Sequence, residues 1–365
     1  MKAAFFSPVF YLAAAPGGWP TPADGYTAEA ARQSMDTALA QFRLADEVGF
    51  DWVTVAEHHF GPIGLTPNPM IFAGVLSQVV KRAKIALLGP NVPILNPVRV
   101  AEEFAMLDTI TNGRIVAGLL RGTPNEYVTY NTNPSESRAR FEEALQIIRM
   151  AWTERQPFGW EGRYFQYRAI SIWPRPVQLP HPPLYMSGSS PESISFAARQ
   201  RVSLGLAVTT LPRATESARM YREQARAAGW QPAPDDVLYR VAFHVADTDD
   251  QALADFEESA NRPQRLSPVK LNRGIEAMVA TTGYYGRDVA RQRERILESS
   301  GLDDRIVSGQ MLFGSPETVI SQLRTIADEM SPGVLDLVPA FQIGARTLRS
   351  IELFGSQVLP RIREL

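Results

Sequence analysis

The residues best suited to catalysis stand together near position 58. An apolar run, Trp52–Ala56, is followed directly by Glu57, His58 and His59, which include two of the four histidines in the chain. The run has the composition of a strand buried on both faces of a parallel sheet. Catalytic groups gather at the carboxyl ends of such strands, where Glu57 and His58 would lie. An imidazole at that place is suited to moving a proton near neutral pH.

The two adjacent histidines are not expected to act together. Neighbouring residues point to opposite sides of an extended chain, so at most one of His58 and His59 faces a common site. Their spacing also differs from the His-x-His and His-x-x-x-His patterns that direct two imidazoles at one metal ion. The strand-end position favours a functional histidine over one satisfied in the core, and we expect no metal site.

The composition excludes several classes of protein. With 365 residues, of which 45% are hydrophobic, the chain can bury a large core. The net charge is −2 and no block of lysine and arginine is present, so we expect no nucleic-acid partner. The absence of cysteine rules out disulfides and thiolate catalysis, and it suits a cytoplasmic protein. No segment has the length and apolarity of a membrane span, so we expect no membrane partner.

Strand-like and helix-like segments alternate along the whole chain, as in an α/β protein with a parallel sheet and crossover helices. We predict eight strands, at 2–8, 52–56, 85–88, 115–120, 184–187, 204–208, 238–245 and 334–338. Eight strand–helix pairs favour one closed (β/α)8 TIM barrel over two domains, so residues 1–365 are expected to form a single domain. An insertion after the seventh strand, 247–310, is expected to be a lid or substrate-shaping loop, or else extra surface helices.

The helix predicted over residues 69–82 is unusually apolar. It carries large apolar side chains and no charge before Lys81; these side chains are Met70, Ile71, Phe72, Val75, Leu76, Val79 and Val80. One buried face cannot accommodate so many, so we expect a second copy of the chain to cover the rest and the protein to form a homodimer.

Residues that could bind a phosphate group follow the fourth and fifth predicted strands. Arg121 brings a fixed positive charge with a planar fork of donors. Gly188, Ser189 and Ser190 precede a helix that begins near Pro191, whose first N–H groups would point outward. In a barrel these strand ends converge on one mouth, which favours an anion site. The alternative is ordinary loop composition beside a solvated surface arginine.

Seven short motifs, in their order and spacing, resemble the bacterial luciferase-like family of flavin-dependent monooxygenases. They are Ala-Glu-His-His-Phe (56–60), Asn-Pro-Val-Arg-Val-Ala-Glu-Glu (96–103), Leu-Asp-x-x-x-x-Gly-Arg (107–114), Arg-Gly (121–122), Ser-Arg-Ala-Arg-Phe-Glu-Glu-Ala-Leu (137–145), Pro-Pro-Leu-Tyr-Met-Ser-Gly-Ser-Ser (182–190) and Gly-Ser-Pro-Glu-Thr-Val (314–319). Members of that family are β/α barrels, and the resemblance covers nearly the whole chain.

The resemblance implies roles for residues at the flavin ring. His58 matches the family's active-site histidine, beside the reactive edge of the isoalloxazine, and Glu57 matches an acidic residue near the flavin. Leu88-Gly89 falls where members hold a non-proline cis peptide bond under the ring. Leu120 stands where luciferase itself carries a reactive cysteine.

The resemblance also implies roles at the flavin phosphate. Arg121 and Arg138 match phosphate-binding arginines, and Ser190 and Ser193 match hydroxyls that complete the phosphate site. Ser189 stands where luciferase carries a glutamate. Because the cysteine and the glutamate of luciferase are both replaced, the resemblance implies monooxygenation and does not imply light emission.

The activity implied by the resemblance is that of a two-component monooxygenase. Reduced FMN would come from a separate NAD(P)H:flavin reductase, since no nicotinamide-binding Gly-x-Gly-x-x-Gly follows a predicted strand. The reduced flavin would react with O2 to give a C4a-peroxide that oxygenates a small, largely apolar organic substrate. Six residues could line its pocket or simply pack in the core: Phe6, Phe10, Phe60, Ile63, Tyr284 and Tyr285.

Two alternatives to this function stay open. The first is an oxidoreductase of the same fold that binds reduced deazaflavin and transfers hydride without oxygen. The second is a non-catalytic protein that binds flavin. Oxygen consumption would separate the monooxygenase from both.

Overall fold

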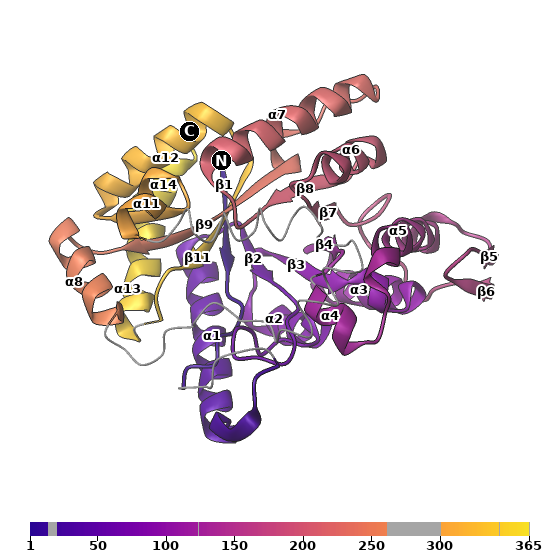
Figure 1. Ribbon diagram of the computed structural model, residues 1–365, viewed down its shortest axis with the longest axis horizontal. Coiled ribbons are helices and arrows are strands. Elements are labelled where there is room, and N and C mark those ends of the chain that lie inside the picture. Colours follow the sequence, from indigo (N-terminus) through magenta and orange to yellow (C-terminus); the bar gives the residue numbers. More distant parts are fainter. Residues whose placement is uncertain (14–19, 123, 261–300, 343, 365) are drawn as a thin grey trace.

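A closed barrel of eight parallel strands forms the centre of the computed structural model, which describes residues 1–13, 20–122, 124–260, 301–342 and 344–364 (Figure 1). The strands are β1 (Lys2–Phe6), β2 (Trp52–Val55), β3 (Lys84–Asn91), β4 (Ile115–Leu120), β7 (Leu184–Ser187), β8 (Ser203–Leu206), β9 (Val237–Val245) and β11 (Val334–Pro339). They pair in the order β9-β11-β1-β2-β3-β4-β7-β8, and β8 pairs with β9 to close the ring. The predicted TIM barrel is confirmed.

A ninth parallel strand, β10 (Met311–Gly314), lies beside β9 and was not among the predicted strands. Because β8 pairs only with the first residues of β9, Val237–Tyr239, the later part of β9 would be an open edge, and β10 covers Ala242–Val245. The Asp249 carboxylate fastens the two ends of the insertion, because it accepts hydrogen bonds from the Ser315 N–H and the Thr318 hydroxyl at 2.6 and 2.9 Å.

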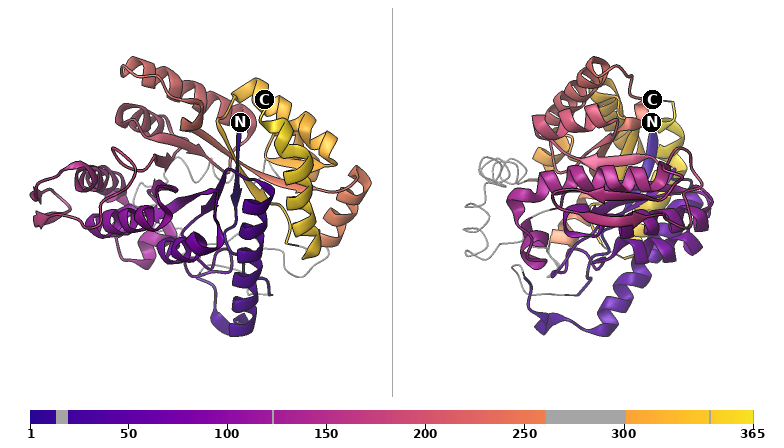
Figure 2. Two further views of the ribbon diagram at one scale, coloured as in Figure 1. Left: turned by 180° about the vertical axis from the view of Figure 1, so that it is seen from behind. Right: turned by 90° about the vertical axis from the view of Figure 1, so that its right-hand side faces the viewer.

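Helices lie around the outside of the strands (Figure 2). The α-helices are α1 (Ala28–Val48), α2 (Pro69–Val79), α3 (Pro97–Thr111), α4 (Pro124–Thr129), α5 (Ser137–Thr153), α6 (Pro191–Gln200), α7 (Leu211–Ala227), α8 (Asp249–Ala260), α11 (Leu302–Val307), α12 (Pro316–Met330), α13 (Ala345–Leu353) and α14 (Leu359–Ile362). Short 3-10 turns are η1 (Ala23–Gly25), η2 (Val92–Ile94), η3 (Pro134–Glu136) and η4 (Pro234–Asp236), and η5 (Phe354–Val358) is a π-helical turn. A hairpin of β5 (Phe158–Glu161) and β6 (Gln166–Ile170) projects from the barrel.

The apolar helix predicted over 69–82 ends earlier, at Val79. The reason is the Asp46 carboxylate of α1, which accepts hydrogen bonds from the backbone N–H groups of Lys81, Arg82 and Ala83 at 2.7–3.0 Å. These contacts hold the following residues in an extended connection to β3.

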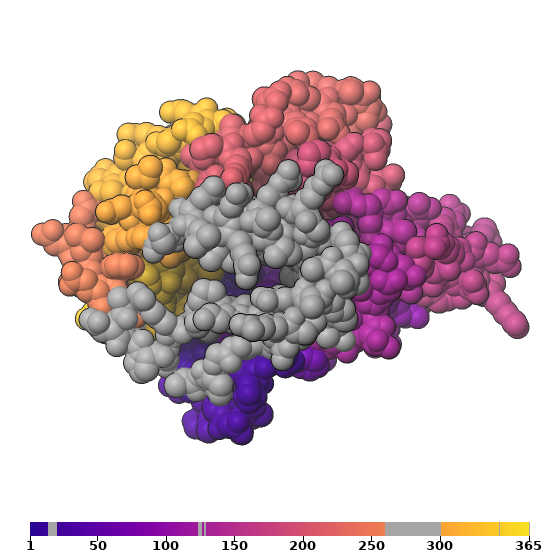
Figure 3. All heavy atoms as spheres, in the orientation of Figure 1, coloured from indigo at the N-terminus to yellow at the C-terminus, as the bar shows by residue number. Residues whose placement is uncertain are grey.

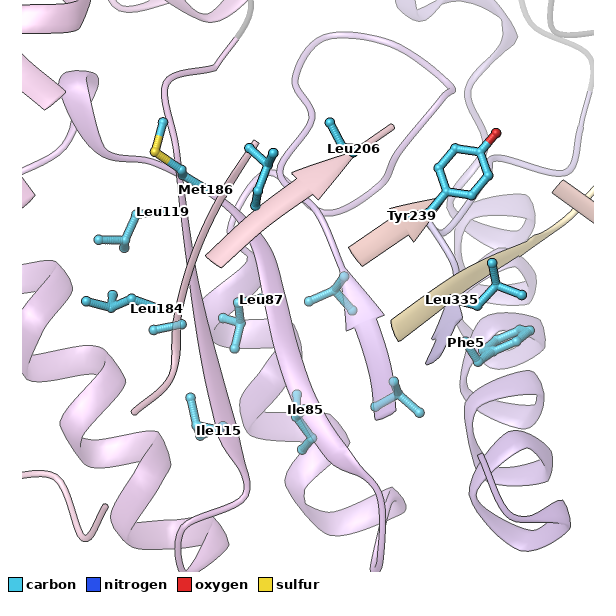
Figure 4. Close-up of a cluster of buried hydrophobic side chains, with 14 of the residues drawn as sticks. Phe5, Ile85, Leu87, Ile115, Leu119, Leu184, Met186, Leu206, Tyr239 and Leu335 are labelled. Atoms are coloured by element: carbon cyan, nitrogen blue, oxygen red, sulfur yellow. The ribbon is translucent and has the colours of Figure 1, made fainter. Parts of the chain in front are cut away.

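Two separate layers of apolar side chains follow from the alternation along each strand. One face of every strand packs against the helices, where Phe5, Leu87, Leu119 and Leu335 are buried (Figure 4). The other face fills the barrel interior with a smaller cluster; it comprises Ala4, Trp52, Ala86, Leu88, Val116, Tyr185, Leu238 and Val334. The barrel is therefore a packed core, with its open end at the carboxyl ends of the strands.

Candidate active site

The carboxyl ends of β2, β3, β4 and β7 form one continuous edge of the barrel mouth, because these four strands are neighbours in this order. Val55 pairs with Leu87, and Gly118 pairs with both Leu88 and Tyr185. The fold therefore brings the predicted site residues on these four strands to one edge. Figure 3 shows the molecule in the orientation of Figure 1, with the N-terminal part in indigo at the bottom and the C-terminal part in orange and yellow at the upper left.

His58 and His59 occupy different surroundings, as predicted from their adjacency. His58 is half-buried, and the Gly64 backbone packs against it so closely that a Cβ at Gly64 would lie 2.9 Å from His58 Cδ2. His59 is buried, and its Nε2 lies 3.0 Å from Glu57 Oε1. His58 is thus the histidine of this pair that keeps exposed surface at the mouth.

The Glu57 carboxylate is engaged inside the protein. It accepts hydrogen bonds from the Asn91 side chain at 2.9 Å and the Asn91 backbone N–H at 3.3 Å, in addition to its contact with His59. It also lines a cavity of about 150 Å³ that reaches Asn96 and Tyr130. Glu57 therefore ties the loop after β2 to the end of β3.

The Leu88–Gly89 peptide bond is trans, so the expected cis bond is wrong for this structure. Instead, β3 continues to Asn91 through a bulge that shifts its pairing with β4 beyond Leu88. The need for glycine at position 89 remains, because a Cβ there would lie 2.4 Å from the Glu57 backbone nitrogen. The extra residue in β3 thus changes the direction of the chain where a cis bond was expected.

The loop before α6 forms a small cradle. The Ser190 hydroxyl caps the helix by accepting a hydrogen bond from the Ser193 N–H at 3.2 Å, and the two hydroxyl oxygens are 3.0 Å apart. A Cβ at Gly188 would lie 2.5 Å from Ser193 Cβ, so only glycine fits. Ser189 is exposed at the rim of this cradle.

The two arginines of the predicted phosphate site stand on elements that neighbour the cradle in the fold, at the end of β4 and in the first turn of α5. Continuing the register of β4 and β7 by three residues places Arg121 beside Gly188. Arg138 lies one turn before Phe141 in α5, just as Ser193 lies one turn before Phe196 in α6, and the two rings meet edge to face at 6.0 Å. Two guanidinium groups, two hydroxyls and the N-terminus of a ten-residue helix therefore suit a phosphate ester, so the cradle fits the phosphate of FMN.

A charged network inside the barrel escaped the sequence analysis. The Arg240 Nε and Nη2 groups each lie 2.6 Å from Asp336 Oδ2, and the Thr54 hydroxyl donates to Asp336 Oδ1 at 2.7 Å. The guanidinium carbon lies 3.5 Å from the centre of the Phe6 ring. The sequence held one signal for this pair: β9 and β11 each carry a single charged residue, Arg240 and Asp336, at a position that faces the barrel interior.

Burial lowers the pKa of His58 to about 4, and the charge of Arg240 and the neighbouring His59 lower it further in the same direction. The imidazole is therefore neutral at neutral pH. Gly64 packs against the Cδ2 side of the ring, whereas Nδ1 lies on the other side of Cγ.

The lowered pKa of His58 predicts an acid-sensitive contribution to stability. The unfolded chain takes up this proton near pH 6.5 and the folded chain only near pH 4, so the contribution is complete above 6.5 and is lost as the pH falls toward 4. The loss amounts to about 3 kcal/mol. Denaturant unfolding from pH 7.5 to 4 should show a shallower fall for His58→Asn, and equal slopes in the two proteins would contradict the assignment.

Three apolar residues with left-handed backbone conformations stand near the mouth. Val9, Phe60 and Val208 have φ angles of 53°, 55° and 53°, and they follow β1, β2 and β8. Such conformations are costly for branched or bulky residues and cluster at functional sites. The strain supports the assignment of this end of the barrel as the functional face.

An apolar cavity of about 190 Å³ lies in the loops after β1 and β2. Its walls include Tyr11, Tyr26, Phe60 and Leu65, and of the residues expected to line a substrate pocket it contains Phe60. Phe6 lies instead inside the barrel under Arg240. Phe10 and Ile63 are half-buried and do not line this cavity. Tyr284 and Tyr285 lie outside the described residues, as does most of the expected lid at 247–310.

The described residues contain neither a candidate metal site nor a candidate membrane span. No group of three His, Asp or Glu side chains in this part of the chain is placed to hold a metal ion. None of the described helices combines the length and apolarity needed to cross a membrane.

Several relatives found by comparison with known proteins align with this chain over about half of their own length. A protein of Sinorhizobium fredii, y4wF, is 36% identical over 172 residues, which are 46% of this chain and 49% of the relative. The oxygenase component of a flavin-dependent trigonelline monooxygenase from Acinetobacter baylyi is 26% identical over 171 residues, 46% of this chain and 47% of the relative.

Solved structures share the fold over the whole chain. The oxygenating constituent of 3,6-diketocamphane monooxygenase from Pseudomonas putida, in complex with FMN, has a TM-score of 0.77 at 21% identity and covers 99% of this chain and 98% of its own. An F420-dependent secondary alcohol dehydrogenase has a TM-score of 0.70 at 19% identity, with 99% of each chain covered. Residues 15–331 match the family model of luciferase-like monooxygenases, so the chain belongs to that family.

Proposed function

We propose that this protein is the oxygenase component of a two-component system, which binds reduced FMN at the barrel mouth and uses O2 to oxygenate a small, largely apolar organic substrate. The observation that supports the proposal is the cradle of Gly188, Ser190 and Ser193 after β7, on the same edge of the mouth as β2, the strand that leads to a neutral His58. Such a cradle suits the phosphate of FMN, which would direct the ring toward His58.

Each residue of the mouth has a part in this proposal. Arg121, Arg138 and the α6 N-terminus bind the phosphate, and Ser189 lies at the rim. Leu88, Gly89 and Leu120 give the ring an apolar surface at the ends of β3 and β4, while Glu57 fixes the loop that carries His58; these four residues complete the proposed cofactor site. Reduced FMN supplies the electrons that activate O2. His58 moves a proton at Nδ1 next to the ring.

Two partners belong to the proposal. A separate NAD(P)H:flavin reductase supplies the reduced FMN, which is supported by the relative that is named an oxygenase component. A second copy of the chain covers an apolar patch on α2 and α3, where Ile71, Val75, Met106 and Ile110 expose 70%, 43%, 48% and 51% of their surface. These two helices pack against each other, so the patch is continuous across them.

The proposed dimer predicts a change of mass in one variant. Ile71→Glu places a charge in the apolar patch and is expected to convert the dimer to a monomer in sedimentation equilibrium. Val307→Glu changes a residue that is 87% exposed on α11, outside the patch, and should leave the dimer intact. A monomeric wild-type protein, or a dimer in Ile71→Glu, would refute this interface.

The experiment that tests the main proposal is an anaerobic titration of the protein with reduced FMN, followed by rapid mixing with oxygenated buffer while absorbance is recorded. We expect tight binding and a long-lived species that differs from both reduced and oxidised FMN. If reduced FMN does not bind, or is oxidised as fast as in free solution, the deazaflavin alternative takes its place and hydride transfer is the assay to run. Reduced FMN that binds and never reacts with O2 would favour the non-catalytic alternative.

A further inference from the structure

We propose that Arg240 forms an oxyanion-binding subsite inside the barrel, and that the organic substrate presents a carboxylate or another negatively polarised oxygen to it. The inference rests on the proposed function and names the chemical class of its substrate: an apolar molecule that carries at least one such oxygen.

The position of Arg240 places it inside the barrel. Its neighbours along β9, Tyr239 and Val241, pack in the layer between the strands and the helices, so the Arg240 side chain points to the interior. Arg240 pairs in register with Asp336 on β11, and β11 is the direct neighbour of β1. The Asp336 side chain is fully buried, whereas 18% of the Arg240 side chain is exposed.

The network is expensive for a barrel interior. Branched apolar residues normally fill this space, and transferring an ion pair out of water costs several kcal/mol per ion. The contacts of this network hold the Arg240 guanidinium in one position. Asp336 holds the Nε and Nη2 edge of the guanidinium, Thr54 holds the other oxygen of Asp336, and the Phe6 ring lies under the guanidinium plane.

The fixed guanidinium keeps donors for a ligand. Arginine has five N–H donors, and the pairing with Asp336 uses one edge of the fork, so the Nη1 side points away from Asp336. Among the described residues, Asp336 is the acceptor that Arg240 contacts. Two parallel hydrogen bonds from the outer Nη groups match a carboxylate or an enolate oxygen.

The subsite belongs to the same mouth as His58. The charge of Arg240 is near enough to contribute to the low pKa of that histidine. Strands β11 and β1 separate β9 from β2 around the barrel, so Arg240 lies across the barrel interior from the strand that leads to His58. A substrate held by its oxygen at Arg240 would therefore extend toward the reacting edge of the mouth.

A purely structural ion pair is the alternative, and small probes separate the two. Formate and formamide have nearly the same size, and only formate is an anion. The chain has four histidines, so the imidazole NMR signal of His58 can be assigned with the His58→Asn variant. We expect formate to shift this signal saturably and to raise the pKa of His58 in the protein without flavin, and formamide to bind at least tenfold more weakly.

Three variants make the test specific. Arg240→Met should weaken formate binding at least tenfold, and Arg240→Lys should restore part of it. If Arg240→Met does not fold because Asp336 is left unpaired, the double variant Arg240→Met with Asp336→Leu replaces the pair by apolar residues and should show the same loss. Arg346→Met is the matched control, since Arg346 also pairs with a buried carboxylate, Asp255, next to a histidine, His244, and this variant should bind formate normally.

The proposal is overturned if formate leaves the wild-type His58 signal unchanged, if formamide binds equally well, or if Arg240→Met keeps the response. An equal loss in Arg346→Met would also overturn it, since the effect would then be general. Because no flavin is present, these results are independent of whether reduced FMN binds or reacts with O2.

Discussion

Replacing His58 by asparagine is expected to lower product formation by about 10²–10⁴-fold, the range for loss of a general acid–base group. Binding of reduced FMN should change little, because the phosphate cradle lies on β4, β7 and the helices that follow them. The physical reason is the imidazole at the mouth, which its lowered pKa of about 4 keeps neutral at neutral pH, with one ring nitrogen free of a proton. The measurement is product formation with saturating reduced FMN and a substrate found in the oxygen-reaction screen.

A matched histidine provides the control for this variant. His181 also has a pKa lowered by burial, and it lies in the connection from α5 to β7, where its ring packs near Trp152 at 5.8 Å. His181→Asn should keep nearly full activity. Similar losses in the two variants would mean that His58 acts through stability, and full activity in His58→Asn would remove it from the mechanism.

Replacing Arg138 by methionine is expected to weaken FMN binding by about 10- to 100-fold, because charge-assisted hydrogen bonds to a phosphate contribute about 1.5–3 kcal/mol. Riboflavin lacks the phosphate, so its affinity should be unchanged by the same substitution. The ratio of the two dissociation constants, measured by fluorescence titration, isolates the phosphate contact from any general effect on the flavin site.

Arg140 is the matched control on the same helix. Its Nε donates to Glu136 at 3.0 Å, one turn earlier on the chain, so it already has a carboxylate partner away from the cradle. Arg140→Met should leave the FMN-to-riboflavin ratio at the wild-type value. If Arg138→Met weakens both ligands equally, or Arg140→Met reproduces its effect, the cradle does not bind the phosphate through Arg138.

Local sequence signals predicted most of the barrel, because its elements satisfy their own preferences. Helix α1 spans an amphipathic run that ends directly before a glycine, and Gly49 forms its left-handed C-cap. Strands β4 and β7 match their predicted ranges, since each is a short apolar run between clear turn residues.

The errors arise where distant residues decide the local structure. The end of α2 depends on the Asp46 carboxylate from another helix, and β10 exists because β8 is too short to cover β9. Similarly, Gly89 at the bulge of β3 packs against the backbone of Ala56 and Glu57, which directly follow β2. None of these contacts is visible in a local pattern of residues.

The candidate site was predictable in part for the same reason. His58 and the cradle at Gly188–Ser193 lie in short motifs at strand ends, where position in the chain indicates position at the mouth. Arg240 and Asp336 are separated by 96 residues and each reads alone as an ordinary charged residue. Only the register of β9 with β11 reveals them as a pair.

The fastening at Asp249 makes the insertion after β9 a replaceable module. Hydrogen bonds from Ser315 and Thr318 to Asp249, together with the pairing of β10 with β9, hold its two ends together. Closure of the barrel therefore does not depend on the number of residues between these ends. Doubling a flexible loop with joined ends costs only about 0.6 kcal/mol. Changing the length of the chain between Asp249 and Ser315 is therefore expected to leave the eight-stranded barrel and the cradle before α6 unchanged.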